Sequence, residues 1–338
     1  MGYLRRPAYY KDFKCISSAC TDSCCTDWEI DVDQDTLDYY MHVEGEFGEE
    51  LKKKIYIPGE DEDALPHFIQ TKNERCPFLN DCNLCEVFIH LGEEHLSQIC
   101  THHPRFYDWF LEGEEAGLGL CCEEAARLVL TSGGKADFNL LFTDDEEVEE
   151  DMEDAKFELL VENTLFKMRD ELFELIGKPN QDSKENLFLD MDHLYNIAYT
   201  MQDRLDDLMF PGDDYEAGQE ELSSFTERFF EEENLEKLLS FYEKLEINDM
   251  NWWKLLKELK KNGKDILNEM DAFLAAHGDY LTEYRNLLIY FIYRHFMKAR
   301  EDNQVKERIA FVLNSICMII VISVYEWMRK GELSLKDR

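Results

Sequence analysis

Cysteine is the residue type whose number and spacing in this sequence most clearly indicate chemistry. Ten of the eleven cysteines lie within the first 122 residues. They form the groups Cys15-x4-Cys20-x3-Cys24-Cys25, Cys76-x5-Cys82-x2-Cys85, Cys100 and Cys121-Cys122, and Cys317 stands alone. Adjacent cysteines rarely build a hydrophobic core, whereas thiolates grouped on loops converge readily on a metal ion or cluster. The pattern therefore predicts a metal-binding region in the N-terminal third of the chain.

The spacing leaves the identity of the metal open. Only Cys82-x2-Cys85 has the separation typical of structural zinc sites, whereas an iron–sulfur cluster needs four sulfurs from any suitable loops. The Cys-x3-Cys-x2-Cys signature of radical methyl-donor enzymes is absent, because Asp27 stands where its third cysteine would fall. His102 and His103 follow Cys100 and are either imidazole ligands or solvated loop residues.

Composition narrows the classes of partner and the compartment. The formal net charge is −38, which repels phosphate backbones and anionic bilayers, so nucleic acid is not an expected partner. The N-terminus lacks the apolar stretch of a secretory signal, so we expect a cytoplasmic location, where clustered thiols are more often metal ligands than disulfides. The apolar run 309–325 is shorter than the roughly 20 residues that span a bilayer, which favours a core helix over membrane insertion.

The chain is expected to be mainly α, in two parts. Residues 1–135 hold five of the seven prolines and ten of the sixteen glycines, which indicates a loop-rich, cysteine-rich metal-binding region with little β structure. Residues 136–338 are expected to form an all-α helical domain, entered through the acidic run 144–154 as a boundary or an exposed helix start. In the first part we expect a short strand over 28–32 and helices over 33–51, 86–99 and from 123 to the Gly133-Gly134 pair; in the second, helices over 155–176, 187–210, 220–246, 251–276, 279–300 and 304–330.

The cysteine groups resemble those of the flagellin lysine N-methylase family, whose N-terminal half carries a zinc- or iron-chelating cysteine region. The resemblance spans residues 13 to 125. It is carried by Phe13-Lys-Cys-Ile-Ser-Ser-Ala-Cys-Thr-Asp-Ser-Cys-Cys-Thr-Asp-Trp28, by Cys76-Pro-Phe-Leu through Leu84-Cys85, by Cys100 with Pro104-Arg105, and by Cys122-Glu-Glu-Ala. The remaining two thirds share only a helical, aromatic-rich character with the family.

The resemblance implies methyl transfer from S-adenosylmethionine to the ε-amine of lysines on flagellin or a similar surface protein, with a four-iron four-sulfur cluster and with zinc as the alternative metal. Cys82, Cys121 and Cys317 are additions to the family pattern. Eight matched sulfurs exceed the four that one cluster requires, so either a second metal site exists or some of them serve structure. By position, the implied metal ligands are Cys15, Cys20, Cys24, Cys25, Cys76, Cys85, Cys100 and Cys122.

The residues themselves assign neither a catalytic group nor a methyl-donor site. No Gly-x-Gly-x-x-Gly motif opens a strand–helix unit, and Gly133-Gly134-Lys135 lacks the spacing of a phosphate-binding loop. Aromatic and charged residues of the second part either line a groove or pack as core and rim of the bundle: Trp252, Trp253, Tyr284, Arg285, Tyr290, Tyr293 and Arg294. A non-enzymatic zinc- or iron–sulfur-binding module, with a redox-sensing or metal-carrying role, is therefore the alternative to the methyltransferase.

Overall fold

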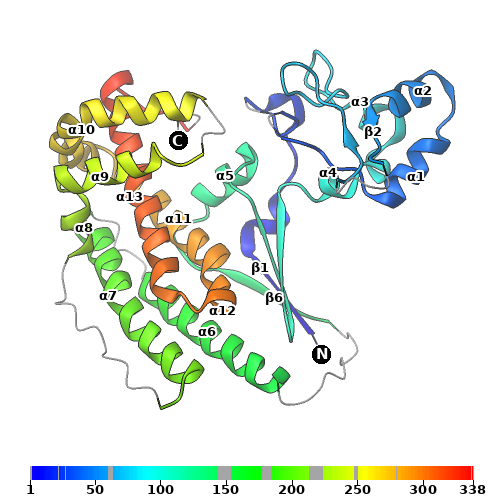
Figure 1. Ribbon diagram of the computed structural model, residues 1–338. Helices are drawn as coiled ribbons and strands as arrows, with labels where there is room; N and C mark the ends of the chain where they lie inside the picture. The colour runs from blue at the N-terminus through cyan, green and yellow to red at the C-terminus, as the bar shows by residue number, and fades with distance from the viewer. Residues whose placement is uncertain are drawn as a thin grey trace.

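The protein forms two lobes joined by a small sheet (Figure 1), as seen in a computed structural model. A cysteine-rich lobe contains the short helices of the N-terminal third, and a helical lobe contains the long helices that follow. The mainly α class expected from the sequence is confirmed. The structure describes residues 2–21, 23–26, 28–59, 64–143, 154–176, 184–212, 224–246, 250–278, 280–335 and 337.

The cysteine-rich lobe is built from short elements around a small core. Tyr40 and Phe78 are among its most deeply buried side chains. Asp33 caps the first helix, because its carboxylate accepts a hydrogen bond from the backbone N–H of Thr36 at 3.0 Å. The elements are α1 (Gln34–His42), α2 (Gly45–Lys53), β2 (Ile55–Tyr56), β3 (His67–Phe68), α3 (Glu86–Leu91) and α4 (Gln98–His102), with 3-10 turns η1 (Ala8–Asp12), η2 (Ser17–Ala19) and η3 (Glu93–His95).

Three of the elements expected in this lobe are interrupted. The helix expected over 33–51 divides into α1 and α2, where Gly45 takes a left-handed φ of 87°. The helix expected over 86–99 ends at Gly92, whose φ is 93°, and only resumes at α4. The strand expected over 28–32 is reduced to a single bridge between Asp31 and His67. In each case a turn within the small lobe overrides the local pattern.

A four-stranded sheet connects the lobes, and none of its strands was expected from the sequence. Its order is β4-β5-β1-β6, with β1 parallel to β5 and antiparallel to β6. Gly113 pairs with Tyr3, and a Cβ at Gly113 would lie 2.4 Å from the Tyr3 carbonyl oxygen, so only glycine allows this approach. The last strand lies beyond residue 135 and pairs with the first. The strands are β1 (Gly2–Pro7), β4 (Arg105–Phe110), β5 (Gly113–Leu118) and β6 (Phe138–Thr143).

The helical lobe has a single large apolar core, to which all the long helices contribute. The helices expected over 155–176, 187–210, 251–276 and 304–330 are each present within a few residues of the expected ends. That expected over 220–246 is divided at Phe230–Glu231. Most of the acidic run 144–154 lies outside the described residues. The elements are α5 (Glu123–Leu130), α6 (Asp154–Ile176), α7 (Lys184–Met209), α8 (Phe225–Phe229), α9 (Glu232–Tyr242), α10 (Met250–Ala276), α11 (Tyr280–His295), η4 (Phe296–Lys298), α12 (Ala299–Asp302) and α13 (Val305–Lys330).

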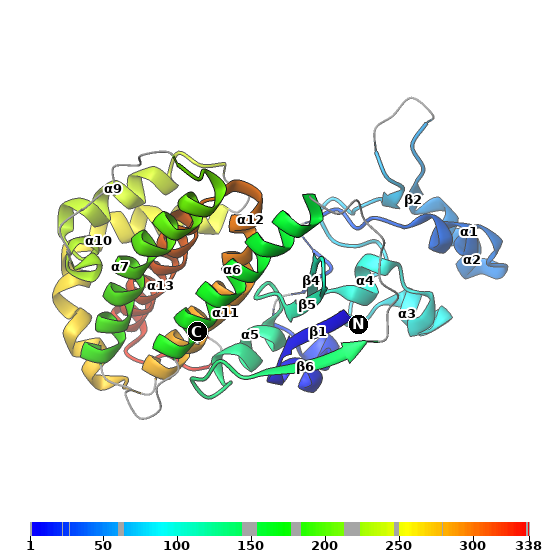
Figure 2. The same ribbon diagram turned by 90° about the horizontal axis from the view of Figure 1, so that it is seen from below.

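Helix α13 contains the apolar run noted in the sequence. By length and composition it is the one helix among the described residues that is long and apolar enough to cross a membrane. Half of its most apolar stretch is buried inside the fold, and Val312, Leu313, Ile316 and Ile320 are fully buried in the core. Figure 2 shows α13 lying behind α7 and α6, within the layers of the helical lobe. The run therefore forms the core helix that was expected.

Buried polar contacts fix the sheet to the helices. The guanidinium of Arg169 on α6 is fully buried and donates to the Glu115 carboxylate of β5, with one N–H···O distance of 2.7 Å. The Tyr293 hydroxyl of α11 lies 2.9 Å from the Arg5 carbonyl oxygen and 3.1 Å from that of Ala116. The sheet thus determines where the cysteine-rich lobe meets the helices.

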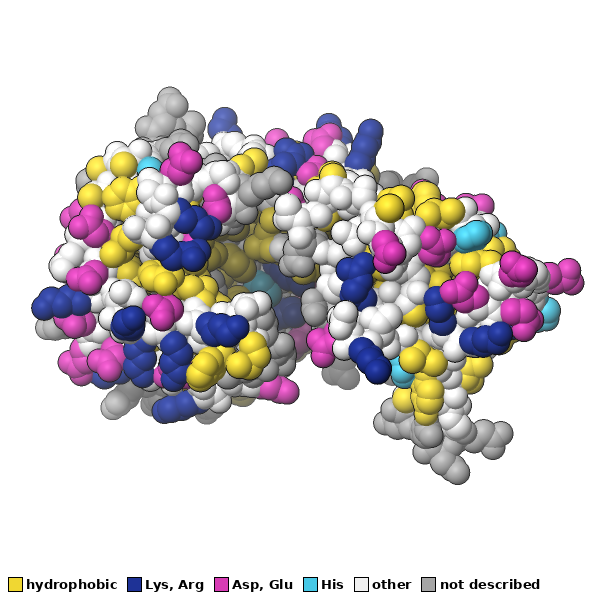
Figure 3. Space-filling model, turned by 90° about the horizontal axis from the view of Figure 1, so that it is seen from above, with side chains coloured by type: hydrophobic (Ala, Val, Ile, Leu, Met, Phe, Trp, Pro, Cys, Tyr) yellow, Lys and Arg dark blue, Asp and Glu magenta, His cyan; other side chains and the backbone are white. Residues whose placement is uncertain are grey.

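The surface is hollowed between the two lobes, with hydrophobic side chains deep in the hollow (Figure 3).

Candidate functional site

The first two cysteine groups lie side by side in the cysteine-rich lobe. The backbone N–H of Cys76 donates to the Cys25 carbonyl oxygen at 2.8 Å, and the neighbouring residues Thr26 and Arg75 form an antiparallel bridge. The indole N–H of Trp28 donates to the Cys24 carbonyl oxygen at 2.7 Å. Backbone pairing therefore brings together thiols that lie some fifty residues apart in the sequence.

Four cysteines share the core of this lobe, and we call them the inner thiols: Cys25, Cys76, Cys85 and Cys100. Cys76 is 6% exposed and belongs to the core, and the other three pack against it. The chain between Cys76 and Cys85 forms a tight loop, closed by a bridge between Leu79 and Cys85 and by the Asn80 carboxamide oxygen, which accepts two backbone N–H bonds. That loop holds Cys76 and Cys85 in one place.

The other four matched cysteines, Cys15, Cys20, Cys24 and Cys122, form a second neighbourhood that we call the outer thiols. Burial is the main cause of the raised pKa of Cys20, and the charges of Cys122, Cys15 and Cys24 act to raise it further. Cys24 also links this set to the inner thiols, because it hydrogen-bonds with Cys25 and its charge acts on Cys85 and Cys100. The first cysteine loop is attached to α5, because the backbone N–H and the hydroxyl of Thr21 donate to the Glu123 carboxylate at 2.6 and 2.7 Å. Residues about one hundred positions apart in sequence therefore meet here.

Backbone N–H groups point at several of these sulfurs. The Ser17 N–H lies 3.4 Å from the Cys15 sulfur. The Phe78 N–H acts in the same way on Cys76. Cys85 and Cys122 occupy the N-cap positions of α3 and α5, although neither side chain makes a cap hydrogen bond. Burial raises the pKa of each thiol, and backbone N–H groups of the first helical turn act to lower it. An N–H donor two residues after a cysteine stabilises negative charge on the sulfur, as does the positive end of a helix dipole. These N–H groups would therefore stabilise the sulfurs as thiolates once a bound cation offset the effect of burial.

Burial nevertheless opposes ionisation of the same thiols. Desolvation is the main reason that the pKa of Cys20 is raised to about 11 and that of Cys76 to about 12. It likewise raises the pKa of Cys100 to about 11. For Cys24 the hydrogen bond with Cys25 comes first, followed by burial, and the pKa is raised to about 12 although His103 acts to lower it. These four raised pKa values disfavour the thiolate at pH 7, and a bound cation would supply the compensation that several adjacent thiolates need.

The eight thiols therefore have the ligand chemistry that a zinc ion or an iron–sulfur cluster requires. Each set holds four sulfurs, the number that tetrahedral zinc or one cubane cluster takes. The Ser97 hydroxyl lies beside Cys100 and the His103 ring beside Cys24, and each acts to lower the pKa of its neighbouring thiol against the effect of burial. Among the described residues, however, no three His, Cys, Asp or Glu side chains stand at coordination geometry. The structure gathers the sulfurs in two neighbourhoods, and their roles as metal ligands stay a prediction.

The remaining cysteines and histidines are placed apart from the two thiol sets or at their margin. Cys82 and Cys121 are exposed, and Cys317 is fully buried in the helical core on α13. His102 is exposed and contacts Tyr107, whereas His103 stacks on Trp28 with ring centroids 5.9 Å apart. Of the two histidines, His103 is therefore the one that lies beside the thiols.

Sequence reasoning missed several residues that shape this site. Glu123 anchors the first cysteine loop, and Tyr40, fully buried, donates its hydroxyl hydrogen bond to the His95 carbonyl oxygen at 2.7 Å. Trp28 closes the first motif by its bond to Cys24. Trp28 and Glu123 each had a signal in the sequence, because they lie within the first and the fourth matched motif. Tyr40 had none, since it acts through a contact between segments far apart along the chain.

Comparison with known proteins places the chain beside methylases over part of its length. The chain is 28% identical over 129 residues to the flagellar biosynthetic protein FliU of Salmonella muenchen, which covers 38% of this chain and 76% of that protein. It is also 28% identical over 129 residues to the lysine-N-methylases of Salmonella choleraesuis and Salmonella typhimurium. That match spans 38% of this chain but only 32% of each methylase. No family model and no solved structure matches.

These matches support, over about two fifths of the chain, the resemblance to flagellin lysine N-methylases that the cysteine groups indicate. The class defined by fold and site is a mainly α protein with a thiol-rich lobe fixed to a helical lobe through a mixed sheet. Two of the three relatives reported above are named lysine-N-methylase.

Proposed function

We propose that this protein is a protein-lysine N-methyltransferase whose cysteine-rich lobe holds a metal–thiolate group. The observation that carries the proposal is its similarity to two proteins named lysine-N-methylase, together with the packing of four thiols in the core of the cysteine-rich lobe. S-adenosylmethionine is the proposed methyl donor. Flagellin or a similar lysine-bearing surface protein is the proposed substrate, in keeping with the name of the relative FliU, a flagellar biosynthetic protein.

The metal would be held by the inner thiols, the outer thiols, or both. The inner set, Cys25, Cys76, Cys85 and Cys100, lies in the lobe core and would serve to hold it closed. The outer set, Cys15, Cys20, Cys24 and Cys122, lies beside α5, which leads toward the helical lobe. An iron–sulfur cluster would supply redox capacity and positive charge there, whereas zinc would supply positive charge and structure alone.

The reaction requires a neutral lysine amine and a surrounding that favours loss of its proton. A lysine Nζ must be neutral to attack the donor methyl group: the N–C bond forms, the C–S bond breaks, the sulfonium becomes a thioether and the amine loses a proton. Because the pKa of free lysine is near 10.4, the amine needs a desolvated surrounding or a nearby acceptor for its proton. The net charge of −38 favours the approach of a protonated lysine substrate through long-range attraction.

The first experiment is anaerobic purification of the full chain, followed by iron, zinc and acid-labile sulfide analysis and a methyl-transfer assay with labelled S-adenosylmethionine. Flagellin from the source organism and an unrelated lysine-rich protein serve as acceptors. We expect stoichiometric metal and label on lysine, and no label on an acceptor whose lysines have been chemically blocked. Intact, metal-loaded protein that labels no lysine on any acceptor would exclude the methyltransferase.

A metal-binding module with a redox-sensing role is the second candidate, and the exposure of Cys15 specifically favours it. Exposed thiols beside buried ones are accessible to oxidants, while their neighbours can resolve the oxidised sulfur. This candidate predicts reversible loss of metal on mild oxidation without any binding of S-adenosylmethionine. Saturable, stoichiometric binding of that donor would argue against a purely sensing role.

A further inference from the structure

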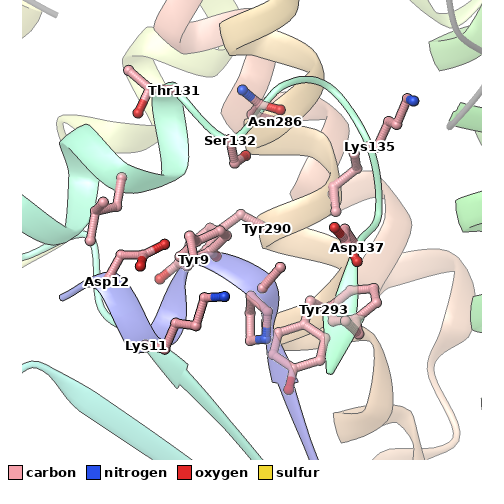
Figure 4. Close-up of a pocket in the computed structure, with 15 residues that line it drawn as sticks. Tyr9, Lys11, Asp12, Thr131, Ser132, Lys135, Asp137, Asn286, Tyr290 and Tyr293 are labelled. Carbon is pink, nitrogen blue, oxygen red and sulfur yellow. The ribbon is translucent and has the colours of Figure 1, made fainter. Parts of the chain in front are cut away.

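A cavity between η1 and the helical lobe, close to the outer thiols, is used by none of the roles described so far. It has a volume of about 360 Å³, at the lower end of the range for small-molecule sites. Three segments far apart in sequence enclose it: η1, the loop 131–137 that follows α5, and α11 (Figure 4). All of its lining residues are described. We therefore consider what such an enclosure is built to bind.

The loop over the cavity is held in a defined shape. Gly133 and Gly134 both take left-handed φ values, 89° and 74°, so they form an arch that other residues would strain. The Asn286 side chain, 2% exposed on α11, fixes this arch because its oxygen accepts from the Gly134 N–H at 2.6 Å. Its amide donates to the Leu130 carbonyl oxygen at 2.7 Å. The cavity is thus a preformed feature with a rigid rim.

Charges of both signs stand at the opening. Figure 4 shows Lys11 and Asp12 on the η1 side, and Lys135 and Asp137 on the side of the arch. Within the described part of the chain, none of these four side chains has a hydrogen-bond or ion-pair partner. A carboxylate and an ammonium group that face one cavity without pairing form a receptor for a zwitterion, whose ammonium and carboxylate each find an opposite charge.

The back wall of the cavity is aromatic and apolar. Tyr9 and Tyr290 lie there with Leu128 and Ile289. Burial raises the pKa of Tyr9 and of Tyr290, so both hydroxyls are neutral at physiological pH and the rings keep their negative faces without carrying charge. Such rings stack on a heteroaromatic base and attract a positively charged sulfur or nitrogen.

The cavity and the outer thiols share packing. Leu128 of the cavity wall belongs to a small core with Leu118 and Ala125, and both Tyr9 and Cys122 pack against that core. Helix α5, eight residues long, has Cys122 at its start and the arch just beyond its end. At about 1.5 Å per residue, roughly 12 Å of helix separates the two sites. A ligand in the cavity therefore lies close to the thiols without replacing any of them.

We propose that this cavity binds the methyl donor, a nucleoside that carries an amino-acid zwitterion and a sulfonium. Asp137 receives the ammonium group, Lys11 receives the carboxylate, and the Tyr9 and Tyr290 rings face the base and the sulfonium. The assignment rests on the proposed function and adds a location to it. It also explains why no glycine-rich strand–helix motif is needed in this sequence, since the donor is held between a 3-10 turn and a glycine arch.

The test is calorimetric titration of the full-length, metal-loaded protein with S-adenosylhomocysteine, the demethylated donor. Asp137→Asn and Lys11→Met each remove one charge from the opening. Asp265→Asn and Lys264→Met remove the same charges from an exposed stretch of α10 and serve as matched controls. We expect the dissociation constant to rise about tenfold in each cavity variant, the cost of one charge-assisted hydrogen bond, and to stay within about twofold in each control.

A methyl-transfer assay on the same proteins separates this inference from the proposed function. Loss of affinity in the cavity variants, with a matching rise in KM for the donor, supports both. Transfer by the unaltered protein with unchanged affinity in Asp137→Asn and Lys11→Met would overturn the cavity assignment and leave the function standing. Binding that depends on both residues without any transfer would keep the cavity and overturn the function. No binding of S-adenosylhomocysteine by the unaltered protein would overturn the cavity assignment.

Discussion

The two lobes differ in how much of their stability can come from packing. The helices of the cysteine-rich lobe are five to nine residues long, whereas α6, α7, α10 and α13 have 23 to 27 residues. The core of the helical lobe is several times larger than that of the cysteine-rich lobe. Short helices are marginal in water unless packing supports them, and a small core supports them little.

This difference shows why cysteines gather in one lobe and not in the other. The helical lobe contributes a single cysteine, Cys317, which is one more apolar side chain in a large core. In the cysteine-rich lobe the thiols occupy the core itself, with Cys76 among its buried members. A lobe that small is expected to depend on a bound metal for its fold, in the way that small zinc domains do.

The largest expected effect is that of metal removal, which tests this contrast directly. Loss of a structural metal costs on the order of 10 kcal/mol, more than the small core can offset. In metal-free protein we expect rapid amide hydrogen exchange over residues 28–103 and retained protection over 280–330. The measurement is hydrogen exchange of loaded and stripped protein under anaerobic conditions. Equal protection of the cysteine-rich lobe in both forms would show that packing alone maintains it.

The next effect concerns the joint between sheet and helices. Glu115→Gln removes the charge that faces the buried Arg169 guanidinium, and a buried cation left without its partner costs about 3–5 kcal/mol. Urea denaturation should show that loss in the free energy of unfolding of the helical lobe. Glu114→Gln, at the neighbouring position that points to the other side of β5, is expected to change it by about 0.5 kcal/mol at most. Similar values for the two variants would refute a structural role for the ion pair.

A smaller effect distinguishes the two buried cysteines. Cys317→Ser places a hydroxyl in an apolar core and is expected to cost about 1–3 kcal/mol with metal content unchanged. Cys76→Ser is expected to lower the metal content, because a serine hydroxyl is a far poorer ligand than a thiolate. Metal analysis and thermal unfolding of both variants make the comparison. Full metal content in Cys76→Ser would remove that residue from the ligand set.

The smallest effect is that of the cap at Asp33. Its carboxylate accepts from the N–H groups of Thr36 and Gln98 at 3.0 and 2.8 Å, so Asp33→Ala should cost about 1 kcal/mol. Burial acts to raise the pKa of Asp33, but these hydrogen bonds prevail and lower it. The stabilisation is therefore complete above the ordinary pKa of the carboxyl, near 3.9, and is lost as the pH falls through the lower folded value.

Acid titration of lobe unfolding, followed by amide hydrogen exchange over α1, measures the Asp33 effect. We expect the unaltered protein to lose stability below about pH 4 and Asp33→Ala to show a shallower acid limb. Asp35→Ala is the matched control, because Asp35 lies two residues further on, in the first turn of α1, and is not the capping residue. Identical acid limbs in Asp33→Ala and the unaltered protein would mean that the cap does not govern this pH dependence.

Much of the helical lobe could be predicted from the sequence. The spacing of apolar residues gave the positions of α6, α7, α10 and α13, because long helices form through local hydrogen bonds and display their period in the sequence. Prediction failed after His42, where α1 ends and a new helix begins at Gly45, and at Gly92, whose left-handed φ ends α3. It also failed for the strands of the sheet, whose short length leaves little periodic signal. The partners of β1 lie more than one hundred residues away, although β4 and β5 pair as a local hairpin.

The sequence by itself determined the candidate chemistry: grouped thiols, the resemblance they carry, and the long helices of the second part. Only the tertiary structure decided which thiols meet, since Cys25 and Cys76, or Cys20 and Cys122, are brought together by pairing and packing between distant segments. The cavity beneath the glycine arch likewise belongs to no single segment. The reason is physical: a residue's type fixes what it can bind, but contacts made across the fold fix what stands beside it.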